Sequence, residues 1–316
     1  MVGSRMRWTG LVSACATGGV LACTVFGRDG GEATQDAGAR DGAGDSAASA
    51  PCDLGAPWGS PVQILFAGDG SEGVATLTED ELTIFFEKRD PKHATIYTAQ
   101  RRTPSDPFTG GAEIAGVPSA QETVHPALSI DGLTLYVSSN RPPAGPFYRL
   151  WASTRASAAA QFTTPVVVTG LDDADGDDLT PFPTAADEVW FASTRGGLTA
   201  NDIFFAAVDG GVLAAPVRAA EVSSPENDGK PVLTRDSLTL FFYSFRGLAS
   251  GTPSDIWTAS RRSRAHAFSP PVPVAELNTP AVEIPVWISK DACRLYLVKG
   301  VSADVNHLFV AARPRR

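Results

Sequence analysis

Short apolar runs recur along this chain at a nearly constant spacing. One set, rich in aromatic residues, begins at Ile96, Leu150, Ile203, Ile256 and Leu308, so that successive copies lie 54, 53, 53 and 52 residues apart. A second set keeps the same period and has its apolar entry at Ile84, Leu135, Val189, Leu240 and Leu295. A fixed period of this length predicts a repeat architecture, in which each repeat is one supersecondary unit that packs on its neighbours.

Each repeat contains four strand-like segments in the same order. A strand led by proline, such as His125–Ser129, is followed by a turn with an aspartate, the two aromatic runs, and a strand led by Pro and Val, such as the one at Pro165. Runs such as Leu240–Tyr243 are apolar on successive residues, which indicates strands that are buried on both faces. A parallel α/β sheet would need helical crossovers, and no segment between the runs has a helical period. The pattern therefore predicts an all-β fold, a β-propeller of four-stranded antiparallel blades.

The two ends of the repeat region complement one another. The last repeat ends at Leu308–Arg313 without a fourth strand, whereas a run of the fourth-strand type, Pro61–Phe66, stands before the first complete repeat. We therefore predict that residues 62–66 form the outer strand of the last blade and close five blades into a ring without an open sheet edge.

The N-terminal segment differs in composition from the repeats. Arg5 and Arg7 precede a run of apolar and small residues, Trp8–Ala22, which is too short to cross a bilayer and predicts a secretory signal over residues 1–22. Residues 23–57 are rich in Gly, Ala, Asp and Ser, which predicts a flexible tether. Residues 58–316 carry the repeats and form the predicted propeller domain.

Cys23 follows Ala22 in the sequence VLAC, which resembles the lipobox of bacterial lipoproteins. The resemblance implies that the signal is removed before Cys23 and that its thiol carries a lipid. The alternatives are an ordinary signal that is cleaved elsewhere and a cytosolic chain with an apolar start. With a lipid, the protein would be anchored in the cell envelope, on the periplasmic or the surface side of the outer membrane. We expect the protein to be a monomer.

Two further cysteines flank the predicted closure of the ring. Cys52 lies just before the orphan strand, and Cys293 lies in the first turn of the blade that this strand would complete. Export would permit a disulfide between them, and such a bridge would staple the closure. The alternative is a pair of free thiols.

The repeats resemble a known family. The segment LSIDGLTLYVSSNR, Leu128–Arg141, and the following LWAST are similar to WD40-like propeller repeats of the TolB type, in which a Ser-Pro-Asp-Gly turn leads into an aromatic strand. The similarity covers about residues 60–313, although only this copy keeps Asp131 and Gly132, and Ile130 stands in place of the proline. The resemblance implies a propeller and, by analogy, a role in binding other envelope proteins.

The charge of the chain excludes one class of partner. A net charge of −9 and a pI near 5.0, without any basic cluster beyond pairs, argue against nucleic-acid binding. The sequence also lacks a nucleophile elbow, a phosphate-binding loop and a paired CxxC motif, so we expect no cofactor.

Charged residues recur where two sets of predicted loops meet at one face of the propeller, around its central channel. Acidic residues precede the first strand of each blade, and arginines follow the second strand of three blades. The predicted binding face comprises Glu72, Glu122, Asp178, Asp228, Glu283, Arg141, Arg195 and Arg246. A ring of carboxylates is also what a glycoside hydrolase requires, with two carboxyl groups about 5 to 10 Å apart and one raised pKa. Because the acids recur at equivalent positions, repeat structure explains them more simply than catalysis.

Two of the arginines suggest clamps inside a blade. Arg195 and Arg246 would each meet the aspartate that precedes the third strand, Asp202 and Asp255 respectively. Charge-assisted pairs of this kind would hold the loops together, and ligand contacts are the alternative.

The densest acidic run, DDADGDD at Asp172–Asp178, is a weak candidate for Ca²⁺ binding. Asp173, Asp175 and Asp177 could supply oxygen ligands, but Gly176 is misplaced for an EF-hand loop. A solvated acidic loop explains the run better, so no metal site is predicted. Taken together, the sequence favours a non-catalytic, lipid-anchored scaffold that binds an envelope protein or a glycan. A secreted glycan-active hydrolase is the alternative, and a purely structural component of the envelope is a third possibility.

Overall fold

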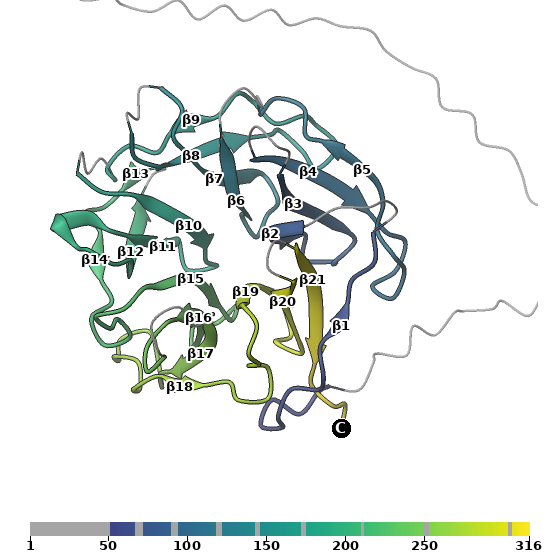
Figure 1. Cartoon of the computed structure of the whole chain (residues 1–316). Helices are drawn as coiled ribbons and strands as arrows, with labels where there is room; N and C mark the ends of the chain where they lie inside the picture. The colour runs from purple at the N-terminus through teal and green to yellow at the C-terminus, as the bar shows by residue number, and fades with distance from the viewer. Residues whose placement is uncertain are drawn as a thin grey trace, which may run out of the picture. The chain divides into compact units, whose positions relative to one another are not determined.

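The computed structural model describes residues 51–66, 72–89, 94–117, 122–142, 146–171, 175–209, 212–248, 253–302 and 305–316. They belong to one compact unit, Ser49–Arg316, and form five antiparallel sheets arranged in a ring (Figure 1). The predicted five-bladed β-propeller is therefore confirmed. The predicted signal, Cys23 and most of the predicted tether lie outside the described residues. Within the described ranges, no helix is long and apolar enough to span a membrane.

Each blade is described from its innermost strand outwards. Blade 1 contains β2 (Glu72–Leu77), β3 (Thr83–Arg89), β4 (Ala94–Gln100) and β5 (Thr109–Glu113). Blade 2 contains β6 (Thr123–Leu128), β7 (Thr134–Ser139), β8 (Arg149–Thr154) and β9 (Val166–Val167). Blade 3 contains β10 (Asp178–Pro183), β11 (Glu188–Ser193) and β12 (Asp202–Asp209), which pairs with both β13 (Val212–Leu213) and β14 (Val217–Arg218). Blade 4 contains β15 (Asp228–Leu233), β16 (Thr239–Ser244), β17 (Asp255–Ser260) and β18 (Val272–Pro273).

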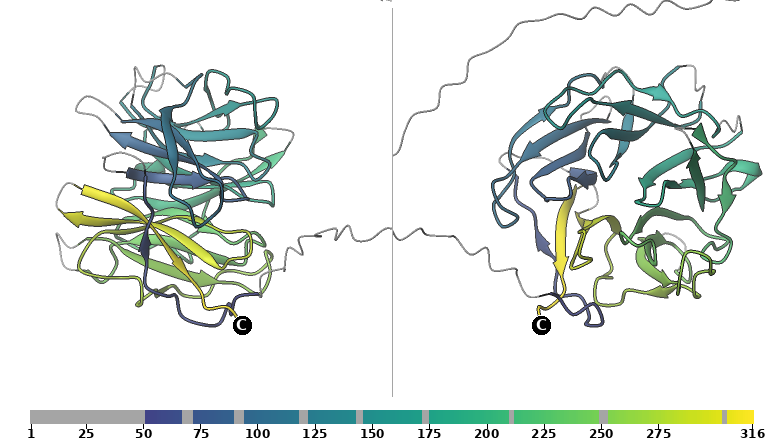
Figure 2. Two further views of the ribbon diagram at one scale, coloured as in Figure 1. Left: turned by 90° about the vertical axis from the view of Figure 1, so that its right-hand side faces the viewer. Right: turned by 180° about the vertical axis from the view of Figure 1, so that it is seen from behind.

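Blade 5 joins the two ends of the described chain. It contains β19 (Glu283–Ile288), β20 (Arg294–Ser302), β21 (Val305–Ala312) and, as its outer strand, β1 (Val62–Gln63). Val62 pairs with Val310, and the two strands lie side by side in every view (Figure 2). The predicted closure is thus confirmed. The strand is shorter than predicted because Phe66 leaves blade 5 and bridges to Phe108 of blade 1.

The predicted disulfide is also present. Cys52 and Cys293 are bonded, with their Cα atoms 5.8 Å apart. The bond ties the segment before β1 to the turn between β19 and β20.

The recurring aspartates shape the turn between the first two strands of a blade. In blade 2, Ser129 donates a hydrogen bond of 2.6 Å to Asp131, whose carboxylate accepts a second from the backbone N–H of Leu133. The same hydroxyl–carboxylate pairs occur as Thr78–Asp80, Thr234–Asp236 and Ser289–Asp291. Gly132 follows with φ of 72°, in the left-handed region that glycine adopts without strain. The Asp-Gly pair of the family motif is therefore explained by the turn, in which Asp131 accepts the hydrogen bonds and Gly132 adopts the left-handed backbone.

The core lies between the blades, as the doubly apolar runs predict. Leu240 and Phe242 pack towards Trp190 of blade 3, whereas Phe241 between them packs towards Leu295 of blade 5. Alternate residues of one strand thus fill two different interfaces, which explains why successive residues of the run are apolar. The five innermost strands pack on one another around the axis of the ring (Figure 1). We call the region along this axis the central channel, and the two ends of the strands define its two mouths.

Candidate functional site

The predicted acidic residues lie together at one mouth of the channel, which we call the upper mouth. Glu72, Asp178, Asp228 and Glu283 each begin an innermost strand. Glu122 precedes Thr123, the first residue of β6, and is therefore offset by one position. The side chains of Asp178, Asp228 and Glu283 are fully buried, so their carboxylates face protein groups rather than solvent.

Arginine clamps hold the acids of blades 3 and 4. Arg195 donates to Asp178 at 2.7 Å, and Arg246 donates to Asp228 at 2.8 Å. In blade 3 the hydroxyl of Ser193 also accepts from Arg195 and donates to Asp178, at 2.7 Å. Each guanidinium lies over aromatic rings of its blade, at 5.0 to 5.5 Å from the ring centres. These clamps fasten the second strand of a blade to the start of its innermost strand.

The arginines therefore have partners other than those predicted. The pairing of Arg195 with Asp202 and of Arg246 with Asp255 is wrong, since Asp202 pairs with Arg218 at 2.6 Å and the two arginines bind the innermost strand. The strand register explains the difference. Asp178 lies directly opposite Ser193, and the backbone turns the arginine two residues later back across this pair.

Blade 2 contains a neutral version of the clamp. Arg141 donates to the hydroxyl of Thr123 at 2.7 Å, and its guanidinium lies 5.2 Å from the ring centre of Trp151. Thr123 occupies the position of the buried carboxylates, because Glu122 stands one residue earlier. Glu122 instead forms an ion pair of 2.6 Å with Arg89 of blade 1.

The remaining two acids pair with residues of blade 5. His307 contacts Glu72 at 2.9 Å and thereby links blade 5 to blade 1. Lys299 lies 3.7 Å from Glu283, whose carboxylate also accepts a hydrogen bond from Thr279. Burial raises the pKa of both Glu283 and Asp178, against the lowering effect of their basic partners and hydrogen bonds.

The innermost strands contain three further residues that the sequence reasoning missed. His125, Thr180 and Lys230 each occupy the third position of an innermost strand and have φ of 56°, 52° and 49°. Each lies inside a β-bulge, and each precedes a proline. Bulges redirect side chains, and left-handed backbone at residues other than glycine is strained, so such positions concentrate at functional sites. The repeated X-Pro pair in the innermost strand was the available signal.

Lys230 is the most unusual of these residues. It is fully buried, and no group in the described part of the chain forms a hydrogen bond with its Nζ. Burial lowers its pKa to about 7, against the opposing attraction of Glu87. Burial raises the pKa of Glu87. The pKa of His125 is lowered to about 3 by burial and then by the charges of Lys230 and Arg89, so this imidazole is neutral at neutral pH.

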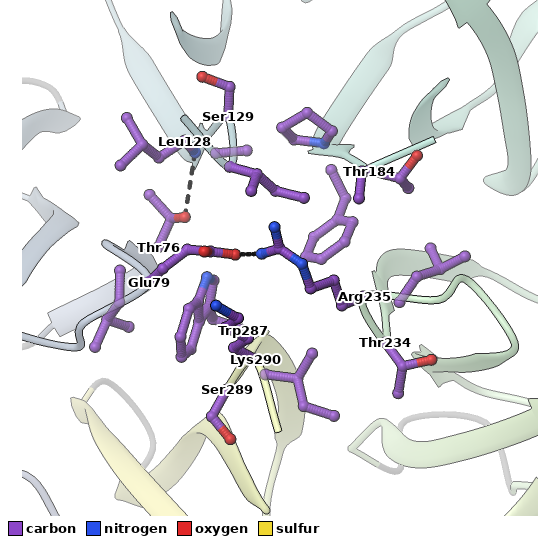
Figure 3. A pocket seen from close by; sticks show the side chains of 18 of the residues that line it. Thr76, Glu79, Leu128, Ser129, Thr184, Thr234, Arg235, Trp287, Ser289 and Lys290 are labelled. Atoms are coloured by element: carbon purple, nitrogen blue, oxygen red, sulfur yellow. Dashed lines mark hydrogen bonds and ion pairs between the residues drawn. The ribbon is translucent and has the colours of Figure 1, made fainter. Parts of the chain in front are cut away.

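Lys230 lines a cavity at the opposite mouth of the channel, which we call the lower mouth. The cavity has a volume of about 50 Å³ and is lined by residues from all five blades. Its walls include the apolar side chains of Phe182, Leu233 and Trp287. Glu79 and Arg235 form an ion pair that crosses the cavity from blade 1 to blade 4 (Figure 3).

The acidic run before β10 lies partly outside the described residues, since these exclude Asp173. The carboxylate of Asp177 accepts a hydrogen bond of 2.8 Å from the backbone N–H of Tyr148. Within the ranges that the structure describes, no group of three or more His, Cys, Asp or Glu residues could hold a metal ion.

The comparisons with known proteins agree on the fold. No family model and no curated protein matches the sequence. Among solved structures, a thermostable family-43 glycoside hydrolase is 10% identical with a TM-score of 0.51, and covers 81% of this chain and 92% of its own. A GH62 hydrolase in complex with xylotriose is 7% identical with a TM-score of 0.50, and covers 84% and 95%.

TolB proteins are also among the similar structures, as the repeat resemblance implied. TolB from Acinetobacter baumannii is 12% identical with a TM-score of 0.42, over 78% of this chain. The match spans only 56% of the length of that TolB chain. At such identities the hydrolase structures show a shared fold, and the chain is a five-bladed member of the β-propellers.

Proposed function

We propose that the propeller is a non-catalytic binding scaffold of the cell envelope, and that it binds a protein or a glycan. The observation that carries this proposal is the pairing of the acids at the upper mouth. A glycoside hydrolase needs one carboxylate that attacks or activates water and a second that delivers a proton. Here Asp178 and Asp228 are engaged by Arg195 and Arg246 inside their blades, and these contacts support an architectural role for the ring of acids.

The proposed contact surface is the accessible part of the upper mouth. It includes Glu122 and Arg89, with side chains that are 25% and 58% exposed. Tyr148 adjoins them and shares a hydrogen bond with Glu122. A paired carboxylate and guanidinium beside a phenol offer donors and acceptors to a polar partner, such as a glycan or the loop of an envelope protein.

Capture of partners by the immobilised full-length protein tests this proposal. We expect the protein to retain a component of envelope extracts or of a glycan array, and the Arg89→Glu variant to retain at least tenfold less. Arg102→Glu is the matched control, because Arg102 is also exposed but follows β4 at the other end of its blade. Equal loss in both variants would argue against the upper mouth as the contact surface. Release of reducing ends from polysaccharides by the purified protein would overturn the non-catalytic proposal.

A glycan-active hydrolase is the second candidate. The raised pKa of Asp178 and of Glu283 favours it, since a general acid must hold its proton near neutral pH. Two solved structures with this fold are glycoside hydrolases by name. In an enzyme, Asp178→Asn or Glu283→Gln would abolish turnover while the other variants of the ring keep it. If the protein is a binding scaffold, neither the original protein nor any of these variants shows turnover.

The proposed location rests on Cys23, which lies outside the described residues. A lipid on this thiol would hold the propeller at a membrane through the predicted tether. The Cys23→Ser variant should move from the membrane fraction to the soluble fraction. Retention of this variant in the membrane fraction would remove the lipid anchor from the proposal.

A further inference from the structure

Basic residues gather at the lower ends of blades 4 and 5. Residues 51–57, 234–238, 261–271, 289–293 and 313–316 lie there, and they contain eight arginines and lysines but only three acidic residues. Arg261 donates to the backbone carbonyl of Ser237, and the disulfide joins Cys52 to Cys293, so these segments adjoin one another. The fold thus joins cations from four separate segments into one surface, which we call the basic patch. Its cations are Arg235, Arg261, Arg262, Arg264, Lys290, Arg313, Arg315 and Arg316.

Most of these cations reach solvent. Six are exposed, namely Arg235, Arg262, Arg264, Lys290, Arg315 and Arg316. Three of the six form ion pairs, Arg235 with Glu79, Arg264 with Glu188 and Arg316 with Asp53. When the two glutamates are added to the three aspartates of the patch, eight cations still stand against five carboxylates. The patch therefore keeps an excess of positive charge on a chain whose net charge is −9, and such a surface attracts an anionic partner.

An open cleft between blades 4 and 5 lies within the basic patch. Its volume is about 460 Å³, which is in the range of sites for small ligands, about 300 to 1,000 Å³. Arg235, Lys290 and Arg313 supply its cations, and Phe241 and Ile288 form an apolar part of its wall. The inner end of the cleft adjoins the cavity at the lower mouth, because Arg235 and Lys290 line both (Figure 3).

The carboxylates in the cleft serve the turns of the blades. Asp236 accepts hydrogen bonds from Thr234 and from the backbone N–H of Leu238. Asp291 accepts the corresponding pair of hydrogen bonds in blade 5. Their positions recur in the other blades, whereas the cations of the cleft do not. At the position of Arg235 and Lys290, the first two blades have Glu79 and Ile130. Since the repeat does not require the cations, a role specific to blades 4 and 5 explains them.

The predicted tether joins the propeller at the basic patch. The backbone carbonyl of Pro51 accepts a hydrogen bond of 3.0 Å from the backbone N–H of Arg316. Leu54 lines the cleft and is 55% exposed. An exposed apolar side chain among arginines and lysines is typical of surfaces that lie on a membrane. A membrane that holds the tether would thus meet the side of the propeller that carries the excess of positive charge.

We propose that the basic patch binds the anionic headgroups of membrane lipids, and that the cleft between blades 4 and 5 holds one phosphate-bearing headgroup. Arginines and lysines near an anionic bilayer are attracted to it within about a Debye length. This contact turns the upper mouth away from the membrane. The inference goes beyond the proposed function, because it requires neither a lipid on Cys23 nor a partner at the upper mouth.

Flotation with lipid vesicles tests the proposal on the full-length Cys23→Ser variant, which cannot be lipidated at this position. The protein should float with phosphatidylcholine vesicles that contain phosphatidylglycerol, and at least about tenfold less with pure phosphatidylcholine. Salt at about 1 M should abolish the preference, because it shortens the Debye length to about 3 Å. Equal flotation with both vesicles would refute the proposal. Retention on alginate without any preference for anionic vesicles would do so as well, since the partner would then be an acidic polysaccharide.

Charge reversals locate the contact. In the Cys23→Ser background, Arg262→Glu combined with Lys290→Glu should lower flotation with the anionic vesicles at least about tenfold. Lys88→Glu combined with Arg102→Glu is the matched control, because it changes the net charge equally but lies on blade 1. The control should keep the binding of the Cys23→Ser protein. An equal loss in both combinations would show that only the total charge matters, and would overturn the assignment to the basic patch.

Hydrogen exchange without substitutions in the propeller keeps the test independent of the charge variants. Anionic vesicles should slow exchange of the backbone amides of residues 261–268 and 289–293, and leave those near the upper mouth unchanged. Protection near the upper mouth instead would overturn the inference. The two proposals fail separately. Without a preference for anionic vesicles the proposed function still stands if partners are captured, whereas loss of capture in Arg262→Glu with Lys290→Glu, but not in Arg89→Glu, would move the partner to the basic patch and refute both.

Discussion

The disulfide between Cys52 and Cys293 joins residues that are 241 positions apart and fastens the outer strand of blade 5 to the first turn of the same blade. Such a bond stabilises mainly by restricting the unfolded chain, and for a loop of this length the effect is about 3 to 5 kcal/mol. We expect the Cys52→Ser and Cys293→Ser double variant to lose about this free energy of unfolding in urea. A reductant should destabilise the original protein by the same amount and leave the double variant unchanged. Equal sensitivity of both proteins to the reductant would contradict the prediction.

The arginine clamps offer an internal comparison between blades. Arg246→Met removes the cation that pairs with the fully buried carboxylate of Asp228, which keeps its hydrogen bonds from Ser224, and should cost about 3 to 5 kcal/mol, as the loss of one partner of a buried pair does. Arg141→Met removes a hydrogen bond to the neutral hydroxyl of Thr123 and should cost about 1 to 3 kcal/mol. Urea unfolding of the two variants measures the difference, and equal losses would show that the carboxylate of Asp228 does not set the cost.

The segment before β1 contributes to stability through one aromatic side chain. Trp58 is buried, packs edge-on against Phe241, and has the guanidinium of Arg313 4.2 Å from its ring centre. Trp58→Ala should therefore cost about 3 to 5 kcal/mol. Val62→Ala is the control, because Val62 lies in the closing strand but is 66% exposed, and it should change the unfolding free energy by no more than about 0.5 kcal/mol. A large effect of Val62→Ala would place the stabilisation in the strand pairing instead of in the buried ring.

The fold was accessible from the sequence because one physical constraint repeats. Every blade must bury both faces of its strands, so apolar runs such as Leu240–Tyr243 recur with the period of the blade. The closure could be predicted by counting strands. The last repeat lacks a fourth strand and the chain has an extra strand of this type before the first repeat, so pairing the extra strand with the last blade completes all five blades. The repeat period and the strand count depend only on the order and spacing of residues along the chain, and these can be read from the sequence.

The partners of charged side chains were less accessible. Arg195 was assigned to Asp202 because the two residues flank one loop, but the guanidinium turns back over Phe191 to reach Asp178. That choice depends on the register of paired strands and on side-chain rotamers, which the repeat pattern does not specify. The repeat pattern does not reveal the burial of Lys230 for a similar reason. A lysine in a strand is expected to face solvent, and only the bulge before Pro231 directs it into the channel.

Because His125 is neutral in the folded protein, the unfolding free energy should depend on pH in the acidic range. Between pH of about 3 and 6.5 the unfolded chain holds a proton on this imidazole that the folded chain has released. The contribution of His125 to the unfolding free energy therefore rises with pH across this window. The same contribution is lost as the pH falls from about 6.5 to 3. His125→Asn, which tolerates the left-handed backbone, should flatten this rise. The raised pKa values of Glu87, Asp178 and Glu283 act in the opposite direction in both proteins, so the difference between the two curves reports His125.

Because of Lys230, we expect a second increase of the unfolding free energy with pH, in the basic range. Its pKa is about 7 in the folded protein and 10.5 as a model value for an unfolded chain, so between these values the unfolded state binds more protons than the folded state. The unfolding free energy should therefore increase with pH from about 7 to 10.5, and the Lys230→Met variant should lack this increase. Below pH 7 the folded protein must bury the ammonium, so Lys230→Met should be the more stable protein there. Urea unfolding at pH 6 and pH 9 measures both effects. A variant that is less stable than the original protein at pH 6 would show that the ammonium has a stabilising partner within the chain.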